Sequence, residues 1–193
     1  MKILLVNNDS DTWDELCEAV GAAGHDVTPT HYADIDRTAT SQHDLAILSG
    51  GWWYDDEVEL LEKYGEELNF IRTSPIPILG ICIGMQLLHV SLDRAVPLLD
   101  APQTGLKEIV TTTVGRERYG LPSTMKVHKN HTRGVIDADP IFEVLAISPG
   151  HVEIIRHTER PMLGVQFHPE VGPREQSANL LNALIALIAK EII

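Results

Sequence analysis

The sequence is short of cysteines and of basic residues, and both shortages limit what the protein can be. Two cysteines, Cys17 and Cys82, are too few for a disulfide framework, and no Cys/His cluster has the spacing of a zinc site. Lysine and arginine number 15 against 28 aspartates and glutamates, which gives a net charge of −13. Because nucleic acids and anionic membranes bind basic surfaces, we expect neither as a partner.

Long hydrophobic runs are also missing. The opening "MKILLV" is apolar, but the polar "NNDSD" ends it too early for a signal-peptide core or a membrane span. The composition, 44% hydrophobic and 22% charged, is typical of a globular protein. We expect a single cytoplasmic domain covering residues 1–193.

The first half of the chain alternates apolar runs with amphipathic ones. Trp13, Leu16, Cys17 and Val20 recur at helical spacing, so Cys17 is interpreted as a packing residue rather than a reactive one. Strands are predicted at 2–6, 25–32, 44–49 and 76–81, with helices near 13–20, 56–71 and 84–92. This alternation is typical of an α/β fold with a parallel sheet.

The second half reads as a run of strands, several of them antiparallel, before a last helix from about Glu175 to Lys190. The predicted strands cover 108–114, 124–129, 142–148, 151–157 and 162–167. We therefore expect a three-layer, open, mainly parallel sheet with helices on both faces and an antiparallel strand addition.

Cys82 lies where the strand "IPILGI" passes into the helix "GMQLLHVSL", with Gly80 and Gly84 on either side. A residue at a sharp strand-to-helix turn is exposed at the carboxyl edge of the sheet, and such a turn needs small residues two positions before and after it. Backbone N–H groups opening the helix, that of Ile83 among them, favour a thiolate and can bind an oxyanion. A structural cysteine beside a tight turn is the alternative.

A base and an orienting group follow 86 residues later, in "GVQFHPEV". His168 and Glu170 flank Pro169, which disfavours a helix and favours an extended His168. At a period near two, both side chains leave the same side of the backbone, so Glu170 is placed to orient the His168 imidazole. The alternative is a strand end that exposes an unrelated His and Glu.

Together, "GICIGMQ", "GVQFHPE" and "ILSGG" resemble the triad-type (class I) glutamine amidotransferases, over nearly the whole chain. The segment "IRHTERPMLGVQFHPEV" looks most like the glutaminase of guanosine monophosphate synthetase. The resemblance implies that Cys82 attacks the glutamine amide, with His168 as base and Glu170 as its orienting group. No metal and no cofactor is expected.

The resemblance also implies roles for further site residues. It implies that the Gly51 and Ile83 amides bind the oxyanion and that substrate lies against Gly50 and Gln86. "KNHT" falls where the family often has Ser-His, so Asn130 and His131 are carried over as substrate-binding positions with a changed first residue.

The chain departs from the family at three places. "NNDSDTW" matches neither of two common versions of its loop, and the usual paired glycines after the elbow helix are missing. Trp52, Trp53 and Tyr54 follow the oxyanion loop, where relatives often have proline and small residues. These aromatic residues either pack on the sheet and a helix or form a lid or partner surface.

Three functions stay open from the sequence. The first is a glutaminase that supplies ammonia to a separate synthetase subunit, since residues 1–193 show no nucleotide-binding loop and we expect them to form one domain. The second is a stand-alone hydrolase or peptidase of small γ-glutamyl compounds. The third is a non-catalytic regulatory module of the same fold.

Overall fold

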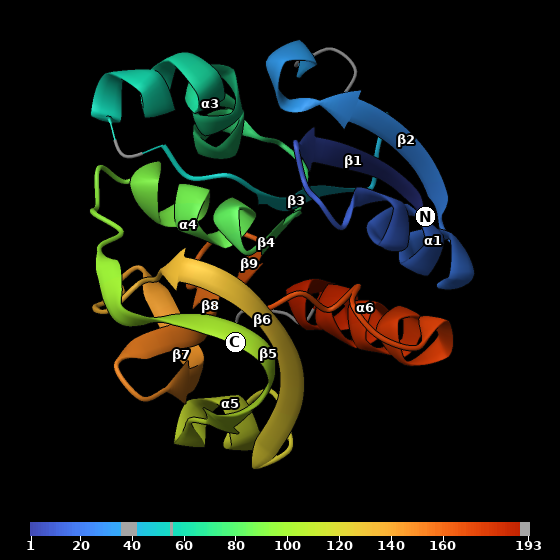
Figure 1. Cartoon of the computed structure of the whole chain (residues 1–193). Coiled ribbons are helices and arrows are strands. Elements are labelled where there is room, and N and C mark those ends of the chain that lie inside the picture. The colour runs from blue at the N-terminus through green and yellow to red at the C-terminus, as the bar shows by residue number, and fades with distance from the viewer. Residues whose placement is uncertain (36–41, 55, 190–193) are drawn as a thin grey trace.

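A computed structural model describes residues 1–35, 42–54 and 56–189 of the chain, and the strands of these ranges form one mixed sheet of nine (Figure 1). The strand order is β2-β1-β3-β4-β9-β8-β7-β5-β6. Parallel pairing joins its first five strands, which are β2 (Asp26–His31), β1 (Lys2–Asn8), β3 (Leu45–Gly51), β4 (Ile78–Ile81) and β9 (Met162–Val165). The α/β class predicted from the alternating pattern is therefore confirmed.

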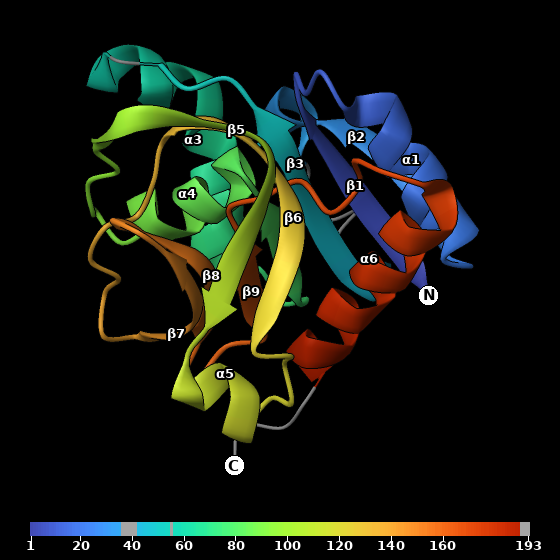
Figure 2. The same ribbon diagram turned by 60° about the horizontal axis from the view of Figure 1, so that its bottom comes forward.

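The remaining four strands add to β9 in antiparallel fashion, and Figure 2 shows β5 and β6 as a long twisted pair. They are β8 (His151–His157), β7 (Phe142–Ser148), β5 (Leu98–Thr111) and β6 (Thr124–Arg133). The predicted antiparallel addition is present, and the predictions for 142–148 and 151–157 match β7 and β8 residue for residue.

Helices pack against the sheet through two separate apolar clusters. The first cluster contains side chains from α1 (Trp13–Ala22) and α6 (Arg174–Ala189), and the second contains side chains from α3 (Glu57–Thr73) and α4 (Ile83–Val90). A short 3₁₀ helix (Tyr32–Asp34) follows β2, and α5 (Thr113–Glu117) follows β5. No helix among the described residues is long and apolar enough to cross a membrane.

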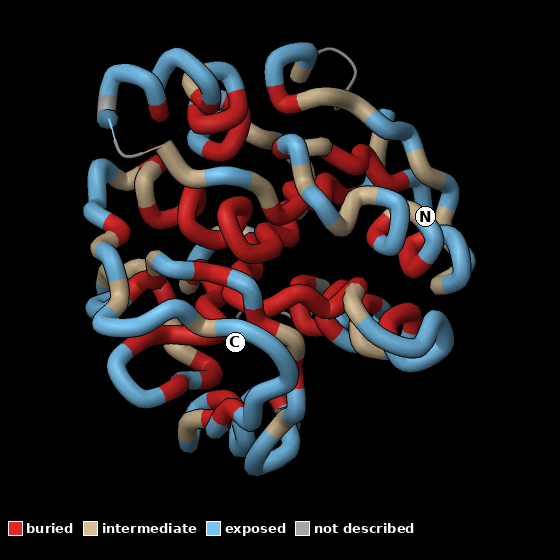
Figure 3. The backbone as a smooth tube through the Cα atoms, in the orientation of Figure 1, coloured by how far each residue is buried: buried red, intermediate tan, exposed pale blue. Residues whose placement is uncertain are grey.

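The parallel strands are apolar on both sides because helices cover them. Ile3, Leu4, Leu5 and Val6 of β1 alternate between the two clusters, and each is at most 3% exposed. Figure 3 shows the buried residues concentrated in α4 and the strands around it, with the outer turns of α3 and most of β5 exposed. Burial on both faces explains the continuous apolar runs in the sequence.

The prediction of a strand over 108–114 is wrong at both ends. β5 begins at Leu98 and ends at Thr111, and the chain then turns into α5. The hydroxyl of Thr112 accepts a hydrogen bond from the Gly115 N–H (3.0 Å), so this threonine caps a helix instead of continuing the β-branched run.

Other boundaries also differ from the prediction, and the largest difference is that β6 runs to Arg133 instead of residue 129. β9 ends at Val165, so Gln166 and Phe167 lie in a bend rather than in the predicted strand 162–167. The last helix is described from Arg174 to Ala189, and its predicted end at Lys190 falls outside the described residues. The bend after Val165 directs the chain across the carboxyl edge of β4, where Cys82 lies.

Candidate active site

The turn between β4 and α4 holds Cys82 in an unusual backbone conformation. Its φ of +52° and ψ of −105° are rarely adopted by a residue with a side chain. A Cβ atom on Gly80 would lie 2.6 Å from the Gly84 backbone, and one on Gly84 would lie 2.6 Å from the Leu48 carbonyl oxygen. The predicted need for small residues on either side of Cys82 is confirmed.

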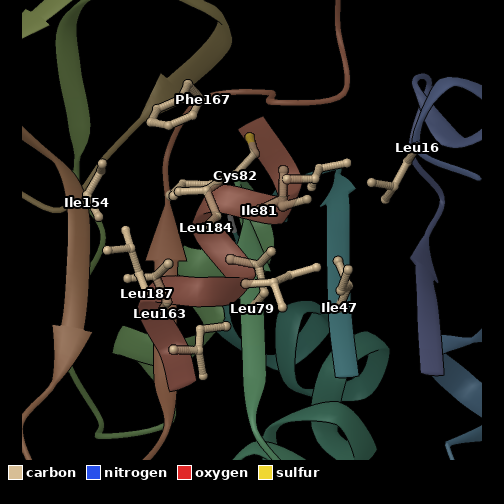
Figure 4. Close-up of a cluster of buried hydrophobic side chains, with 14 of the residues drawn as sticks. Leu16, Ile47, Leu79, Ile81, Cys82, Ile154, Leu163, Phe167, Leu184 and Leu187 are labelled. Carbon is tan, nitrogen blue, oxygen red and sulfur yellow. The ribbon is translucent and has the colours of Figure 1, made fainter. Parts of the chain in front are cut away.

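Cys82 is 5% exposed, so the expectation of an exposed residue is wrong. Figure 4 shows it at one end of the first apolar cluster, beyond Ile81 and Leu184. Cys82 lines a cavity, together with residues of the loops that follow β1, β3 and β9 and of the strands β5 and β6. Burial keeps bulk water away from the thiol.

His168 and Glu170 are in direct contact. His168 forms an isolated β-bridge with His128, and its Nδ1 lies 2.7 Å from Glu170 Oε1. The pairing predicted from the sequence is confirmed, but the route differs: the chain turns after His168, with the Val171 N–H donating to the His168 carbonyl (3.3 Å). A tight turn, and not an extended strand, brings the two side chains together.

The electrostatic surroundings favour a proton on His168. Burial of the imidazole lowers its pKa, but interactions with Cys82 and Glu170 outweigh burial and raise the pKa of His168 to about 11. Because Glu170 takes up Nδ1, the buried Nε2 is the ring atom left for Cys82. At neutral pH the imidazole can therefore hold the proton that a thiol must lose to become a nucleophile.

Polar groups around the loop at the end of β3 hold its shape. The Ser49 hydroxyl donates to the Gly50 carbonyl (2.7 Å) and accepts from the Asn8 N–H (2.9 Å). Since this bond fixes the Gly50 carbonyl, it also fixes the peptide plane that carries the Gly51 N–H. A Cβ on Gly51 would lie 2.1 Å from the Asn8 carbonyl oxygen, so only glycine fits there.

A buried carboxyl group supports the same loop from α3. Glu67 is fully buried, and its Oε1 accepts a hydrogen bond from Asn8 Nδ2 (3.1 Å), which also donates to the Ser49 carbonyl (3.2 Å). Burial raises the pKa of Glu67 to about 8, against the smaller opposing effect of the Asn8 bond. Glu67 is thus mostly neutral at pH 7 and avoids the cost of an unpaired buried charge.

A cavity of about 210 Å³ opens beside Cys82 and His168. This volume suits a small metabolite rather than a drug-sized ligand. Sequence-predicted residues supply nine of its sixteen lining residues, namely Gly51, Trp52, Trp53, Cys82, Ile83, Gln86, Asn130, His131 and His168. Gly50, Tyr54 and Glu170 do not line it. A Cβ on Gly50 would come within 2.8 Å of the His168 ring, so this glycine makes room for the imidazole.

Two glutamine side chains are hydrogen-bonded to each other next to the Cys82 thiol. Gln86 Nε2 donates to the Arg133 carbonyl (3.0 Å) and to Gln166 Oε1 (3.1 Å), and Gln166 Nε2 lies 3.7 Å from Cys82 Sγ. Sequence reasoning missed Gln166, although it lies inside the quoted "GVQFHPE". Its position depends on the bend after β9, which the sequence pattern does not show.

Asn130 and His131 reach the cavity from β6. Asn130 is exposed, whereas His131 is 7% exposed and its Nδ1 lies 2.9 Å from the Arg133 carbonyl oxygen. Burial lowers the pKa of His131 to about 4, so this ring is neutral at pH 7. A neutral His131 adds polarity to the cavity without adding charge.

The three aromatic residues after the oxyanion loop have different surroundings. Trp52 is 59% exposed and lines the cavity, and its backbone carbonyl accepts from the Tyr64 hydroxyl (2.9 Å). Trp53 packs against the second apolar cluster, with the Arg133 guanidinium 5.3 Å from its ring centre. Tyr54 packs on the same cluster. Packing therefore accounts for Trp53 and Tyr54, and it does not account for Trp52.

His131, His151 and Glu153 form a group whose donor atoms lie within 4.8 Å of one another, a donor set that could hold zinc. Lys129 Nζ, however, already pairs with the fully buried Glu153 carboxylate, and His151 Nε2 lies 2.7 Å from the same oxygen. Burial favours the neutral acid, but these donors outweigh burial and lower the pKa of Glu153. The carboxylate is therefore compensated without a metal ion.

The loop between β1 and α1 supplies cavity residues that sequence reasoning missed. Ser10, Asp11 and Thr12 line the cavity, and Thr12 Oγ1 donates to Glu170 Oε1 at 2.6 Å. The signal was the unusual "NNDSDTW", which is rich in hydroxyl and carboxylate groups and follows a parallel strand, where ligands commonly bind. Pro102, Thr104, Thr132 and Arg133 complete the β5–β6 side.

Comparisons with known proteins agree with this geometry. The family model described as "Glutamine amidotransferase class-I" matches residues 4–187. The chain is 31% identical over 157 residues to a glutamine-hydrolysing GMP synthase subunit of Thermoplasma acidophilum, covering 81% of this chain and 78% of the relative. It is 32% identical over 136 residues to the corresponding subunit of Methanococcus aeolicus, covering 70% and 69%.

A solved structure is similar as a whole. The crystal structure of a T. acidophilum protein described as a candidate subunit of GMP synthase aligns with a TM-score of 0.83 and 28% identity. The alignment covers 98% of this chain and 94% of that one. The likeness therefore extends over the parallel and the antiparallel strands alike.

Proposed function

Because the chain belongs to the class-I glutamine amidotransferase family, whose members are cysteine-nucleophile hydrolases, we propose that it hydrolyses glutamine through Cys82, His168 and Glu170. The ammonia released passes to a separate synthetase subunit. One observation carries the proposal: His168 is bonded to Glu170 at 2.7 Å and shares a small cavity with a thiol at a strained strand-to-helix turn. The whole chain acts as one glutaminase domain, with helices on both faces of the parallel strands as a three-layer arrangement.

The chemistry is a double displacement at the side-chain carbonyl of glutamine. The Cys82 sulfur attacks this carbon, and the negative charge on oxygen is held by the Gly51 and Ile83 N–H groups. The C–N bond then breaks while His168 gives its proton to the leaving ammonia, which leaves a γ-glutamyl thioester. Water, deprotonated by His168, attacks the thioester and releases glutamate and the thiol.

The surrounding groups divide the remaining work. Glu170 keeps the imidazole in one orientation and stabilises its positive form. Gln86 and the β6 residues Asn130 and His131 bind the substrate, whose amino-acid end lies between the β1–α1 loop and β6, where Asp11 and Arg133 carry opposite charges. Gly50 serves the site through the space that it leaves for the His168 ring.

The decisive experiment is a glutaminase assay with and without a synthetase subunit. The relatives are named as one subunit of GMP synthase, so the other subunit of that enzyme, from the same organism as this chain, is the first partner to test. In the absence of the synthetase's own acceptor substrate, we expect glutamate and ammonia to form in equal amounts and faster with the partner, and Cys82→Ala to form neither.

Two outcomes would replace the proposal. Turnover of γ-glutamyl peptides without a partner, combined with no turnover of glutamine, would make the protein a γ-glutamyl hydrolase. Absence of hydrolysis under all these conditions, together with failure of a glutamine-like electrophile to label Cys82, would make it a regulatory module.

Trp52 and Trp53 are expected to respond differently to substitution. Trp53→Ala should lower the free energy of unfolding by about 2 kcal/mol, since it removes a half-buried ring from the second cluster. Trp52→Ala should change stability by less than about 0.5 kcal/mol but weaken partner binding by about 2 kcal/mol, or raise the KM for glutamine. Thermal denaturation, titration with the partner and steady-state kinetics separate these effects. Unchanged affinity and unchanged KM in Trp52→Ala would remove Trp52 from the site.

A further inference from the structure

Thr12 occupies a helix-capping position without capping the helix. It precedes α1 as the N-cap residue, where a threonine hydroxyl usually accepts a hydrogen bond from a backbone N–H of the first turn. In this chain the Thr12 side chain makes no such bond. Its hydroxyl instead donates to Glu170 Oε1 at 2.6 Å, across 158 residues of sequence.

Glu170 needs such a donor. The residue is 2% exposed, and its Oε1 accepts both from the Thr12 hydroxyl and from His168 Nδ1 (2.7 Å). Its Oε2 is buried and has no hydrogen-bond partner among the described residues. With a single donor left, the carboxylate could rotate about its own bond and lose its fixed position against the imidazole.

Hydrogen bonds within the loop around Thr12 fix the orientation of this hydroxyl. The Ser10 N–H donates to Asn7 Oδ1 (3.1 Å), and the Thr12 N–H donates to Ser10 Oγ (3.3 Å). Ser10 Oγ also lies 3.1 Å from Thr12 Oγ1. Because a carboxylate cannot donate, the Thr12 proton goes to Glu170, and Ser10 is then the donor to Thr12. The Ser10 hydroxyl thus donates to the Thr12 hydroxyl, which in turn donates to the Glu170 carboxylate.

We propose that Thr12 is a positioning residue of the active site, which holds Glu170 and through it His168 in the orientation that glutamine hydrolysis requires. The inference rests on the proposed function, because it assigns Thr12 a role in the same reaction. It explains the "NNDSDTW" loop, which the resemblance to the family leaves without a role. It also explains why a threonine at a capping position makes no capping bond.

Thr12→Val tests the proposal, with Thr112→Val as the matched control. Both changes replace one hydroxyl by a methyl group of similar shape, and both are expected to lower the melting temperature by about 2–4 °C. Thr112 caps α5 and lies outside the cavity lining, so its loss should leave kcat unchanged. Thr12→Val should lower kcat about ten- to a hundredfold with little change in KM, because a misplaced base slows chemistry more than binding.

The conservative variant and a spectroscopic readout complete the test. Thr12→Ser keeps the hydroxyl and should restore kcat to within about threefold of the wild type. In ¹⁵N-histidine NMR spectra, the Nδ1–H resonance of His168 should shift and exchange faster with water in Thr12→Val only. An unchanged kcat and an unchanged resonance in Thr12→Val, or an equal loss of kcat in Thr12→Ser, would overturn the proposal.

The spectroscopic readout does not depend on hydrolysis. If the wild-type protein does not hydrolyse glutamine with any partner, the proposed function fails. The His168 resonance still decides whether Thr12 holds Glu170 and His168 in place.

Discussion

Replacing Cys82 by alanine should abolish glutamine hydrolysis, with a loss of kcat on the order of 10⁶-fold. This is the loss expected when one member of a nucleophile–base pair is removed, since neither member works without the other. Substrate binding should be retained, because the cavity walls stay in place and only one sulfur atom is lost. Steady-state glutamate release and equilibrium binding of glutamine measure the two effects. More than a trace of activity in Cys82→Ala would contradict the assignment of the nucleophile.

The other cysteine is the matched control. Cys17 is half-buried on α1 and packs against the first apolar cluster. Cys17→Ala should keep near wild-type activity and lower the free energy of unfolding by about 1 kcal/mol. Loss of activity in Cys17→Ala would mean that thiol removal at any position damages the protein, and the Cys82 result would lose its meaning.

The backbone of Cys82 adds a test of why a strained residue is kept there. Positive φ costs a residue with a side chain about 1–3 kcal/mol, whereas glycine adopts it freely. Glycine also gains entropy in the unfolded chain, which offsets part of this relief. We therefore expect Cys82→Gly to be more stable than Cys82→Ala by about 1 kcal/mol in denaturant unfolding. The difference between the two free energies of unfolding measures how much stability the protein loses by holding residue 82 in this backbone conformation.

The parallel half of the fold could be predicted because its causes are local. Strands buried on both faces require continuous apolar runs, and β1 and β4 show them in "KILLV" and "IPILGI". Gly80 and Gly84 mark the turn between β4 and α4 for the same reason, since the backbone approaches both too closely for a side chain. Sterics that act over a few residues leave a readable pattern.

The part of the fold that escaped prediction depends on distant partners. β5 begins at Leu98 but contains Pro102 and Gly105, and most of its residues are exposed. Its strand conformation comes from antiparallel pairing with β6, whose Asn130 lies opposite Thr104. No local pattern of alternating apolar residues announces such a strand.

The residues of the site fall into the same two groups, those that a local sequence motif indicates and those that depend on distant contacts. Cys82, His168 and Glu170 lie in short motifs, so the sequence indicates them. Thr12 contacts Glu170 across 158 residues of sequence and Gln166 contacts Cys82 across 84, and only folding brings these pairs together. Side chains that support a reactive group from another element are therefore the hardest to find from sequence.

His168→Ala should be almost as damaging as loss of the thiol, with kcat again reduced by roughly 10⁶-fold. Without the imidazole no group takes the thiol proton or protonates the leaving ammonia. The double variant Cys82→Ala with His168→Ala should lose little beyond either single change, because the two side chains act as one unit. Losses that multiply in the double variant would show that the two groups contribute separately and would contradict the pairing.

His168 also predicts how stability depends on pH. Its pKa in the folded protein is raised to about 11 by Cys82 and Glu170 against the opposing effect of burial, whereas an unfolded histidine titrates near 6.5. Between these values the folded state binds more protons than the unfolded state, so the stabilisation is complete below about pH 6.5 and is lost as the pH rises toward 11.

The free energy of unfolding of the wild type should therefore fall between pH 7 and pH 10 more steeply than that of His168→Ala. Urea unfolding of both proteins across this range measures the difference, in which titrating groups that do not interact with His168, such as Glu67, cancel, whereas Cys82 and Glu170 belong to the measured effect. Equal slopes would show that His168 carries no extra proton in the folded protein, and the thiol would then need another acceptor.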